Sequence, residues 1–323
     1  MNIAIFGLGK MGAQIARRLH KNGFEVLAWN RSEGPRQKFD AFVATTSPAI
    51  LAPSPHKGRD GERLSSRSFD NVSDLVSLID GEPRIFWLML PHEIVDEFLH
   101  DQLLKYLKAG DIVIDGGNSH YKESIKRAEA LRAKGIVFYD CGTSGGVWGE
   151  ENGFALMVGG PKEQWSLVEP IFKVLSSGQN YGLLGKNGAG HFVKMVHNGI
   201  EYGMMEAIGE GYAILKASHF ELDLSEVTRV YQEGTVIRSW LIDLTKNIFD
   251  HEDVESTSGY IHQLGEGKWT VEAGKELGVD VRVLEDSVKV RDESADEANQ
   301  NKFSNKIVAL LRKQFGGHGV KEK

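Results

Sequence analysis

Two side chains in the middle of the sequence, Lys194 and Glu201, have the residue types needed to exchange protons with a substrate. They lie in the segment GAGHFVKMVHNGIEY, whose apolar residues recur with helical periodicity. Counted from Lys194, Asn198 is at i+4 and Glu201 at i+7, which places the three on one helix face, and Tyr202 at i+8 shares it. This face has two explanations. It forms either a buried ion-pair network that locks two domains together, or an acid and a base whose pKa values are adjusted by partial desolvation.

The hexapeptide GLGKMG at residues 7–12 follows an apolar stretch and precedes a helical pattern, the context in which G-x-G-x-x-G indicates dinucleotide binding. Gly7 permits the tight turn, Gly9 lets the backbone approach a pyrophosphate, and Gly12 allows close packing of the helix. The phosphates are then expected at the helix N-terminus. A glycine turn with only a structural role is the alternative. The predicted cofactor contacts in these and later loops are Gly7, Leu8, Gly9, Lys10, Met11, Gly12, Met89, Leu90, Pro91 and Asn118.

The end of the second predicted strand indicates which dinucleotide is used. A site for NAD usually has Asp or Glu there, whose carboxylate accepts hydrogen bonds from the ribose 2′-hydroxyl. This sequence has Asn30, Arg31 and Ser32 instead. A guanidinium pairs with a 2′-phosphate and the two polar side chains donate hydrogen bonds to it, so NADP is favoured over NAD. Arg31 as a solvated loop residue is the alternative.

Apolar stretches alternate with helical patterns through the first part of the chain, a rhythm typical of a doubly wound parallel sheet. A Rossmann-type α/β domain is therefore expected over residues 1–184, interrupted at 47–68 by a segment rich in proline, glycine, serine and charge that predicts a flexible surface loop. Residues 185–323 show only helical patterns and predict an all-α domain. The predicted strands are residues 2–7, 24–30, 85–90, 111–115, 136–140 and 155–158, and the predicted helices of the second domain include 190–217, 225–249 and 281–297.

Composition excludes several classes of function. The formal net charge of −7 disfavours general binding to nucleic acid or to acidic membranes. The longest apolar stretch, residues 85–90, is far shorter than the roughly 20 residues of a membrane-spanning helix. A single cysteine, Cys141, and the lack of a signal-peptide pattern indicate a cytoplasmic protein. The histidines show no metal-ligand spacing, so we expect no metal and a small-molecule partner.

The segment GAGHFVKMVHNGIEY resembles the signature of the 6-phosphogluconate dehydrogenases, within the wider β-hydroxyacid dehydrogenases. The resemblance extends to the glycine motif and to DGGNS at 115–119, GTSGGVWG at 142–149, EGTVIRS at 233–239 and GEGKWT at 265–270. The chain is similar to the short form of the family, which lacks the duplicated helical half of the longer enzymes. It departs from the family's pattern in the insertion at 47–68 and in Thr143, where many members have valine. Short forms use NAD or NADP, so the resemblance leaves the cofactor open.

The resemblance implies oxidative decarboxylation of 6-phosphogluconate to ribulose 5-phosphate and carbon dioxide, with Lys194 as general base and Glu201 as general acid. The tail resembles that of the longer enzymes, where an arginine and a histidine reach the partner subunit's site. Arg312 and His318 would then bind the substrate phosphate across the interface of a homodimer or a larger homo-oligomer. The remaining positions that match the family's substrate contacts are Asn118, Ser144, Gly145, Gly146, His197, Asn198 and Tyr202 for the sugar acid, and Lys268, Thr270 and Arg291 for the phosphate.

Two other functions fit parts of the sequence. A related dehydrogenase for an unphosphorylated β-hydroxy acid would share the catalytic pair but would not need the phosphate positions. A dinucleotide-binding sensor without turnover would need neither Lys194 nor Glu201, so the presence of both argues against it.

Overall fold

The computed structural model describes residues 1–46, 65–262, 265–317 and 319–320. The chain divides into two compact units, Met1–Lys194 and Met195–Lys323. The division falls inside the long helix α8 (Ala189–Ala217), about one turn of which packs against the sheet of the first unit. Of the loop predicted at 47–68, only residues 65–68 are described.

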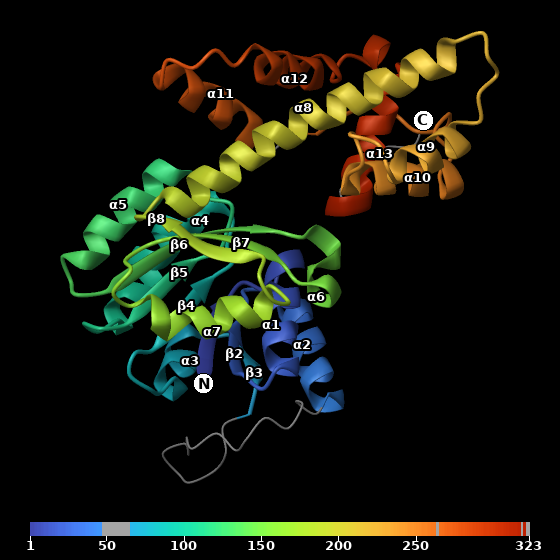
Figure 1. Cartoon of the computed structure of the whole chain (residues 1–323). Helices are drawn as coiled ribbons and strands as arrows, with labels where there is room; N and C mark the ends of the chain where they lie inside the picture. The colour runs from blue at the N-terminus through green and yellow to red at the C-terminus, as the bar shows by residue number, and fades with distance from the viewer. Residues whose placement is uncertain (47–64, 263–264, 318, 321–323) are drawn as a thin grey trace. The chain divides into compact units, whose positions relative to one another are not determined.

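The first unit is built on one sheet, whose strands in the described residues follow the order β3-β2-β1-β4-β5-β6-β7-β8 (Figure 1). Neighbouring strands are parallel, except that β6 and β7 are antiparallel. The strand order reverses at β1, and the loops that follow β1 and β4 therefore diverge at the carboxyl end of the sheet, where such folds bind ligands. The strands are β1 (Asn2–Phe6), β2 (Glu25–Trp29), β3 (Arg67–Phe69), β4 (Ile85–Leu88), β5 (Ile112–Asp115), β6 (Val137–Ser144), β7 (Ala155–Gly159) and β8 (Tyr181–Gly185).

The predicted Rossmann-type fold is confirmed, but the strands differ from the prediction in two respects. β7 runs antiparallel to β6, because the connection between them is too short for the crossover that a parallel pair requires. β3 and β8 were not predicted. β3 has three residues, and β8, with the sequence YGLLG, contains two glycines, which weaken a strand pattern.

Helices cover both faces of the sheet, because the strands are apolar on both sides. One core, around Ile5, Trp87 and Phe172, joins the sheet to α1, α2 and α7, and the other, around Phe6 and Phe86, joins it to α3, α4 and α5. The helical segment that begins at His92 changes type along its length, from α4 to a π-helix and then to a 3-10 helix. The helices are α1 (Lys10–Lys21), α2 (Glu33–Thr45), α3 (Val72–Leu78), α4 (His92–Glu97), α5 (Tyr121–Arg132), α6 (Gly149–Asn152) and α7 (Trp165–Leu175), with further turns at Phe98–Leu103, Leu104–Tyr106 and Gly146–Trp148.

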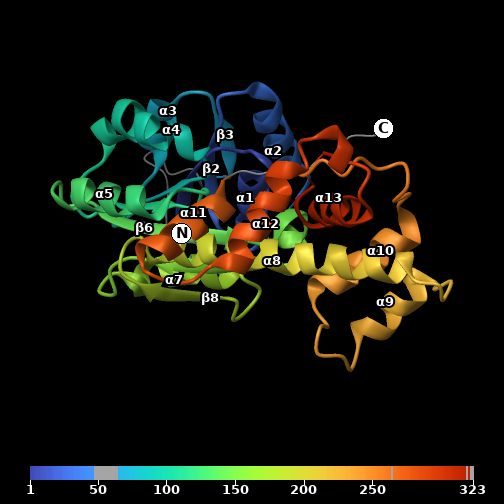
Figure 2. The ribbon, with the colours of Figure 1, turned by 90° about the horizontal axis from the view of Figure 1, so that it is seen from above.

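The second unit contains only helices among its described residues, as predicted. α8 is one uninterrupted helix over nearly the predicted range (Figures 1 and 2). An apolar core around Met205, Ile248 and Ile307 joins it to α10 and α13. The helix predicted over 225–249 is broken at residues 233–239, where Gly234 has a φ of +72°. The other helices are α9 (Leu224–Gln232), α10 (Trp240–His251), α11 (Glu266–Glu276), α12 (Arg282–Glu293) and α13 (Phe303–Gly316).

No helix in the described part of the chain has both the length and the apolar character needed to cross a membrane.

Candidate active site

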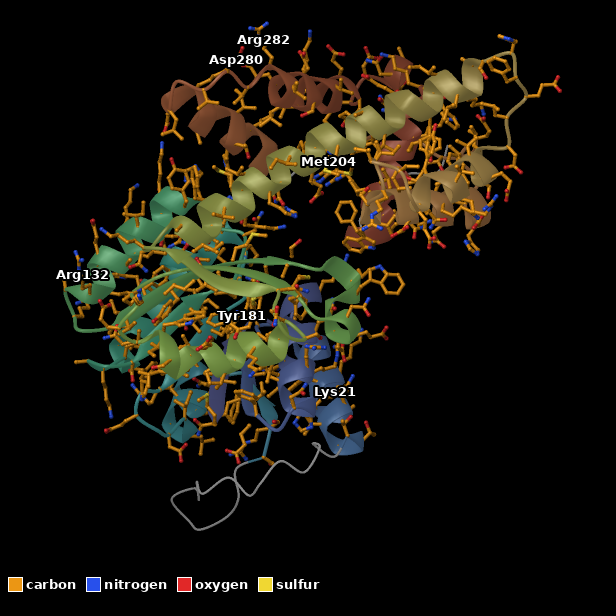
Figure 3. All side chains as sticks on the ribbon, viewed as in Figure 1. Lys21, Arg132, Tyr181, Met204, Asp280 and Arg282 are labelled. Atoms are coloured by element: carbon orange, nitrogen blue, oxygen red, sulfur yellow. The ribbon has the colours of Figure 1, made fainter. Side chains whose placement is uncertain are left out.

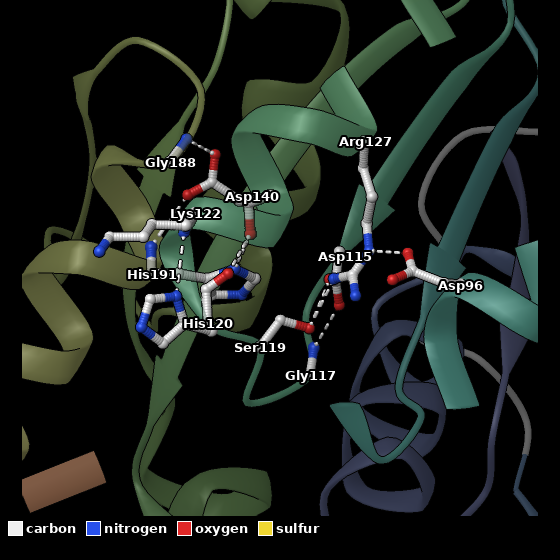
Figure 4. A network of polar contacts seen from close by, with 11 residues as sticks. Asp96, Asp115, Gly117, Ser119, His120, Lys122, Arg127, Asp140, Gly188 and His191 are labelled. Carbon is white, nitrogen blue, oxygen red and sulfur yellow. Dashed lines mark hydrogen bonds and ion pairs between the residues drawn. The ribbon is translucent and has the colours of Figure 1, made fainter. Parts of the chain in front are cut away.

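The start of α8, which carries Lys194, is held by a buried carboxylate from β6. Asp140 is fully buried and accepts hydrogen bonds from the backbone N–H of Gly188 at 2.6 Å and of His191 at 2.9 Å (Figure 4). These N–H groups belong to the first turn of the helix and have no partner within it. Burial raises the pKa of the Asp140 carboxyl, while the nearby His191 and the two N–H donors oppose that shift. Asp140 therefore fixes where α8 begins.

The first turns of α8 lie directly on the backbone of the sheet. A Cβ added to Gly142 would come within 2.2 Å of the Cβ of Lys194, and one added to Gly190 would come within 2.5 Å of the carbonyl oxygen of Asp140. Real Cβ atoms do not approach so closely, so glycine is needed at both positions. These two close contacts fix the position of Lys194 on β6, within the first unit.

The loop that carries Asn118 is held by a second buried carboxylate. Asp115, at the end of β5, accepts hydrogen bonds from the hydroxyl of Ser119 at 2.7 Å and the backbone N–H of Gly117 at 3.1 Å, and pairs with Arg127 at 2.9 Å (Figure 4). Arg127 also pairs with Asp96 of α4. The loop around Asn118 is therefore tied to two helices as well as to its strand.

Three of the predicted cofactor loops meet at the carboxyl ends of β1, β4 and β5. A Cβ on Gly7, which has a φ of +105°, would lie 2.4 Å from the carbonyl oxygen of Met89, and one on Gly117 would lie 2.6 Å from that of Leu90. A Cβ on Gly12 would lie 2.0 Å from the carbonyl oxygen of Gly7, whereas nothing lies within 4 Å of the position a Cβ on Gly9 would take. The glycines thus fit the separate roles that the motif predicts: Gly7 for the tight turn, Gly12 for close packing of the helix, and Gly9 for open space at the helix start.

The start of α1 fits a pyrophosphate. Its N-cap, Gly9, has no side chain to satisfy the first N–H groups of the helix, and no acidic residue lies in its first turn. Such an end attracts a negatively charged group. The residues present therefore fit the dinucleotide that the motif predicts.

Asn30 has a different contact from the one predicted. Its side-chain oxygen accepts a hydrogen bond from the backbone N–H of Leu8 at 2.9 Å, and its amide nitrogen donates to the carbonyl oxygen of Ser32 at 3.0 Å. Both ends of the amide are thus engaged in joining the glycine loop to the end of β2. Arg31 and Ser32 are exposed beside it.

A cleft of about 710 Å³ adjoins the glycine loop, and part of its lining was not predicted from the sequence. Gln14 and Arg17 of α1 and Lys38 of α2 line it, as does Trp148, which follows the predicted substrate turn. The turn itself needs glycine, because Gly145 and Gly146 have φ values of +139° and +54°. Residues 147–151 lie over a hundred positions from α1 in sequence, so only the fold reveals their proximity.

In the second unit, Glu201 lies beside His197. The Nδ1 atom of His197 is 3.9 Å from a carboxylate oxygen of Glu201 and 3.1 Å from the side-chain oxygen of Asn198. All three belong to α8, at the spacing that the sequence predicted. The predicted general acid therefore has an imidazole beside it, and that imidazole also contacts the amide of Asn198.

A buried arginine from α12 packs against the next turn of α8. Arg291 of α12 is 1% exposed, and its guanidinium carbon lies 3.2 Å from the centre of the Tyr202 ring. Its Nε atom pairs with Glu206 at 3.0 Å, but its two terminal nitrogens have no hydrogen-bond partner among the described residues. Burial raises the pKa of Tyr202, although the positive charge of Arg291 opposes this. Unpaired buried donors of this kind are costly, and an anion would satisfy them.

Arg312 belongs to the same cluster in this chain. It is 6% exposed and donates a hydrogen bond to the carbonyl oxygen of His262. Burial lowers the pKa of Arg312, and the charge of Arg291 lowers it further, whereas Tyr202 and Glu201 raise it. Its predicted role across a subunit interface stays a prediction, and His318 lies outside the described residues.

The other two predicted phosphate positions, Lys268 and Thr270, differ in their exposure and in their contacts. Lys268 is half exposed and pairs with Asp292 at 3.0 Å. The hydroxyl of Thr270 is buried and lies 2.6 Å from the carbonyl oxygen of Met195, and a Cβ on Gly199 would lie 2.6 Å from the Thr270 methyl group. The contacts of Thr270 thus pack α11 against α8, and its predicted phosphate contact stays a prediction.

Comparison with known families matches both parts of the chain. Residues 2–185 match the model of the NAD binding domain of 6-phosphogluconate dehydrogenase. Residues 190–321 match the model of the 6-phosphogluconate dehydrogenase C-terminal domain. The two matches meet at the start of α8.

Individual relatives agree with the family models. The YqeC protein of Bacillus subtilis is 39% identical over 324 residues and is matched over the full length of both chains. A protein of Haloferax volcanii named as an NAD(+)-dependent, decarboxylating 6-phosphogluconate dehydrogenase is 37% identical over 327 residues, which cover 100% of this chain and 99% of the relative. Among solved structures, the Plasmodium falciparum 6-phosphogluconate dehydrogenase matches with a TM-score of 0.78 and 29% identity, over 91% of this chain and 62% of that longer chain.

Proposed function

The chain belongs to the 6-phosphogluconate dehydrogenase family, and we propose that it converts 6-phosphogluconate to ribulose 5-phosphate and carbon dioxide with reduction of NADP. The observation that most supports this substrate is the buried guanidinium of Arg291, whose terminal nitrogens have no acceptor among the described residues. A phosphate would supply those acceptors. An unphosphorylated β-hydroxy acid would leave them unpaired, so the alternative dehydrogenase is disfavoured.

Lys194 acts first, as the general base. In its neutral form it removes the proton from the C3 hydroxyl while C3 is oxidised to a ketone. The bound nicotinamide ring supplies the acceptor for the hydride that leaves C3. The fixed position of the Lys194 backbone on β6 suits this role, since proton transfer requires the amine within hydrogen-bond reach of one hydroxyl.

The same lysine promotes decarboxylation as a general acid. The product of oxidation is a β-keto acid, and it loses carbon dioxide when Lys194, now charged, returns its proton to the C3 oxygen. The resulting enediol needs one proton at the carbon that held the carboxylate. Glu201 donates that proton, and Lys194 recovers the enol proton as the ketone of ribulose 5-phosphate forms. The net result is one proton transferred from Glu201 to Lys194, which solvent redistributes.

NADP is the cofactor we propose. The start of α1 holds the pyrophosphate, and Arg31 and Ser32 are exposed at the end of β2, where a 2′-phosphate would lie. Asn30 ties the glycine loop to β2, and its contact with the cofactor stays a prediction. Relatives of both kinds exist: the Plasmodium falciparum enzyme is described in complex with NADP+, and the Haloferax volcanii enzyme is named as NAD(+)-dependent.

We also propose a homodimer or larger homo-oligomer in the cytoplasm. The assembly is inferred from the tail, whose Arg312 resembles an arginine that serves a partner subunit in longer family members. The location is inferred from the single cysteine, since a chain without a possible internal disulfide suits a reducing compartment.

One assay tests the reaction. The purified protein is incubated with 6-phosphogluconate and NADP, and both the absorbance of NADPH and trapped carbon dioxide are measured. Equal amounts of the two are expected, and Lys194→Met should lower the rate by about 10²- to 10⁴-fold, the usual loss for a general base. Reduction of NADP without carbon dioxide, or a Lys194→Met variant with more than about a hundredth of the activity, would contradict the mechanism.

A further inference from the structure

Helix α1 is joined to residues 146–150 by side chains that the mechanism has not used. We call this set, formed by Gln14, Arg17 and Lys21 of α1 with Gly146 and Glu150, the α1 clamp. α1 starts at the glycine loop, and residues 146–150 directly follow the predicted turn for the substrate carboxylate. The α1 clamp therefore connects the proposed cofactor site to the proposed substrate site, within one unit of the fold.

Gln14 is the inner part of the α1 clamp. It is 6% exposed, and its amide nitrogen donates to the carbonyl oxygens of Gly146 at 3.2 Å and of Lys10 at 3.1 Å. Its side-chain oxygen accepts a hydrogen bond from the backbone N–H of Glu150 at 3.1 Å. One amide thus binds both ends of the segment and also the first residue of α1.

Glu150 is the outer part. Its carboxylate pairs with Arg17 at 2.5 Å and with Lys21 at 2.9 Å, and Figure 3 labels Lys21 at the end of α1. Its carbonyl oxygen accepts a hydrogen bond from Arg18 at 2.7 Å. Burial raises the pKa of Glu150, but the hydrogen bonds from Arg17 and Lys21 outweigh it and hold that pKa below its usual value.

The segment depends on these contacts for its position. Gly145 and Gly146 both have positive φ values, and glycines in this region leave the backbone free to take several other conformations. The contacts to α1 select one of them. A ligand that changes how firmly the start of α1 is held therefore changes how firmly the turn at 144–146 is held.

We propose that Gln14 and Glu150 are positioning residues that couple the binding of dinucleotide at the start of α1 to the binding of the substrate carboxylate at residues 144–146. The inference rests on the proposed function, because it uses the proposed substrate. Coupling of this kind is reciprocal: each ligand changes the affinity of the other by the same factor.

Calorimetry with a pair of ligands that cannot react tests the proposal. NADPH and 6-phosphogluconate are both in the reduced state, so the affinity for 6-phosphogluconate can be measured with and without saturating NADPH. In the unmodified protein NADPH should tighten 6-phosphogluconate binding by a factor in the range of about 5 to 150, and the reverse titration should give the same factor. In Glu150→Gln and Gln14→Met the factor should fall to within about twofold of one.

The matched control breaks another ion pair of the same unit. Arg84 pairs with Asp111, and these two residues lie at the amino ends of β4 and β5, whereas the proposed sites lie at the carboxyl ends of the strands. Arg84→Met should lower the melting temperature but keep the coupling factor. Lys21→Met removes only the exposed partner of Glu150, so it tests the α1 clamp with little risk to folding and should give an intermediate factor.

The outcomes separate this inference from the proposed function. An unmodified protein that does not bind or turn over 6-phosphogluconate would remove the proposed function itself. A protein that turns over its substrate but shows a coupling factor of one would overturn the coupling alone. The same conclusion follows if the variants of the α1 clamp change affinity for each ligand while the factor stays at its unmodified value.

Discussion

The Cβ of Lys194 lies 2.2 Å from the position that a Cβ on Gly142 would take. The side chain of the lysine on α8 therefore starts directly against the backbone of the glycine on β6, with no other side chain between them. The position of the proposed general base is set by this contact and by Asp140, which holds the start of the same helix.

Gly142→Ala should therefore damage catalysis more than cofactor binding. The added methyl group has to displace the start of α8, and a misplacement of about 1 Å can cost about 10² in rate. We expect kcat to fall by about that factor while the KM for NADP stays within about twofold. Steady-state kinetics with both substrates measures this. A variant with unchanged kcat would show that the contact between Gly142 and the Lys194 side chain does not set the position of Lys194.

Glu201→Gln should slow the last proton transfer, because an amide cannot protonate the enediol. The rate of solvent deuterium entry at C1 of ribulose 5-phosphate should fall by about 10²-fold or more. Mass spectrometry of the product formed in heavy water measures it. The matched variant is Glu206→Gln on the same helix, whose carboxylate pairs with Arg291 instead; it should raise KM for the substrate and leave the deuterium entry step unchanged.

Arg31→Ala should weaken NADP much more than NAD, since only NADP carries the 2′-phosphate that the guanidinium can bind. The ratio of kcat/KM for the two cofactors is the measurement, and loss of a charge-assisted contact of about 1.5–3 kcal/mol predicts a shift of about one to two decades. Arg132→Ala, at the end of α5, is the control for removal of an arginine elsewhere. An unmodified protein that already prefers NAD would contradict the predicted cofactor.

Arg312→Ala should raise KM for 6-phosphogluconate by about one to two decades, on the same energetic grounds. Mixing this variant with Lys194→Met distinguishes two geometries. If the tail serves the partner subunit, as the proposed homo-oligomer requires, a hybrid dimer contains one intact site, and we expect activity to return once the subunits exchange. In this chain Arg312 contacts His262 and lies near Arg291, so mixtures that stay inactive at low substrate after exchange would show that each chain uses its own arginine.

The pKa of Glu150 predicts how the α1 clamp responds to acid. A carboxyl whose pKa is depressed in the folded state stabilises the protein above its unfolded pKa, and this contribution is lost as the pH falls through the folded value. The difference in unfolding free energy between the unmodified protein and Glu150→Gln should therefore be largest near pH 7 and shrink below about pH 4.5. Urea titrations at several pH values measure it. A difference that is constant from pH 7 to pH 3 would mean that the carboxylate contributes no charge interaction.

Much of the fold follows from local sequence pattern, and the exceptions have identifiable causes. The glycine motif and α8 were predicted within a few residues, because their signals, glycine spacing and helical periodicity, are contained in short windows. The direction of β7 was not predicted, since a strand pattern contains no information on which way its neighbour runs. The break between α9 and α10 at Gly234 was missed because apolar periodicity continues on both sides of it.

The prediction of the site was limited for a related reason: a local pattern does not show which distant residues come into contact. Arg291 could be placed only by counting from Lys268, whereas the fold puts it over the ring of Tyr202. The contact between Gln14 and Glu150 could not be predicted, because the two residues are 136 positions apart in the sequence. Asn30 was predicted at the cofactor phosphate, and nothing in the sequence indicated its hydrogen bonds to Leu8 and Ser32. Side chains whose partners are backbone groups of distant loops are the ones that a single sequence conceals.

Trp148 lines the cleft beside the glycine loop and is 43% exposed, so its position has a consequence for the fluorescence of the protein. Of the six tryptophans in the chain, Trp87 is fully buried in the sheet, so its emission is insulated from solvent. The indole of Trp148 is exposed to whatever fills the cleft. Its fluorescence should therefore respond to occupancy, and the protein carries an intrinsic reporter next to its cofactor site that requires no added dye.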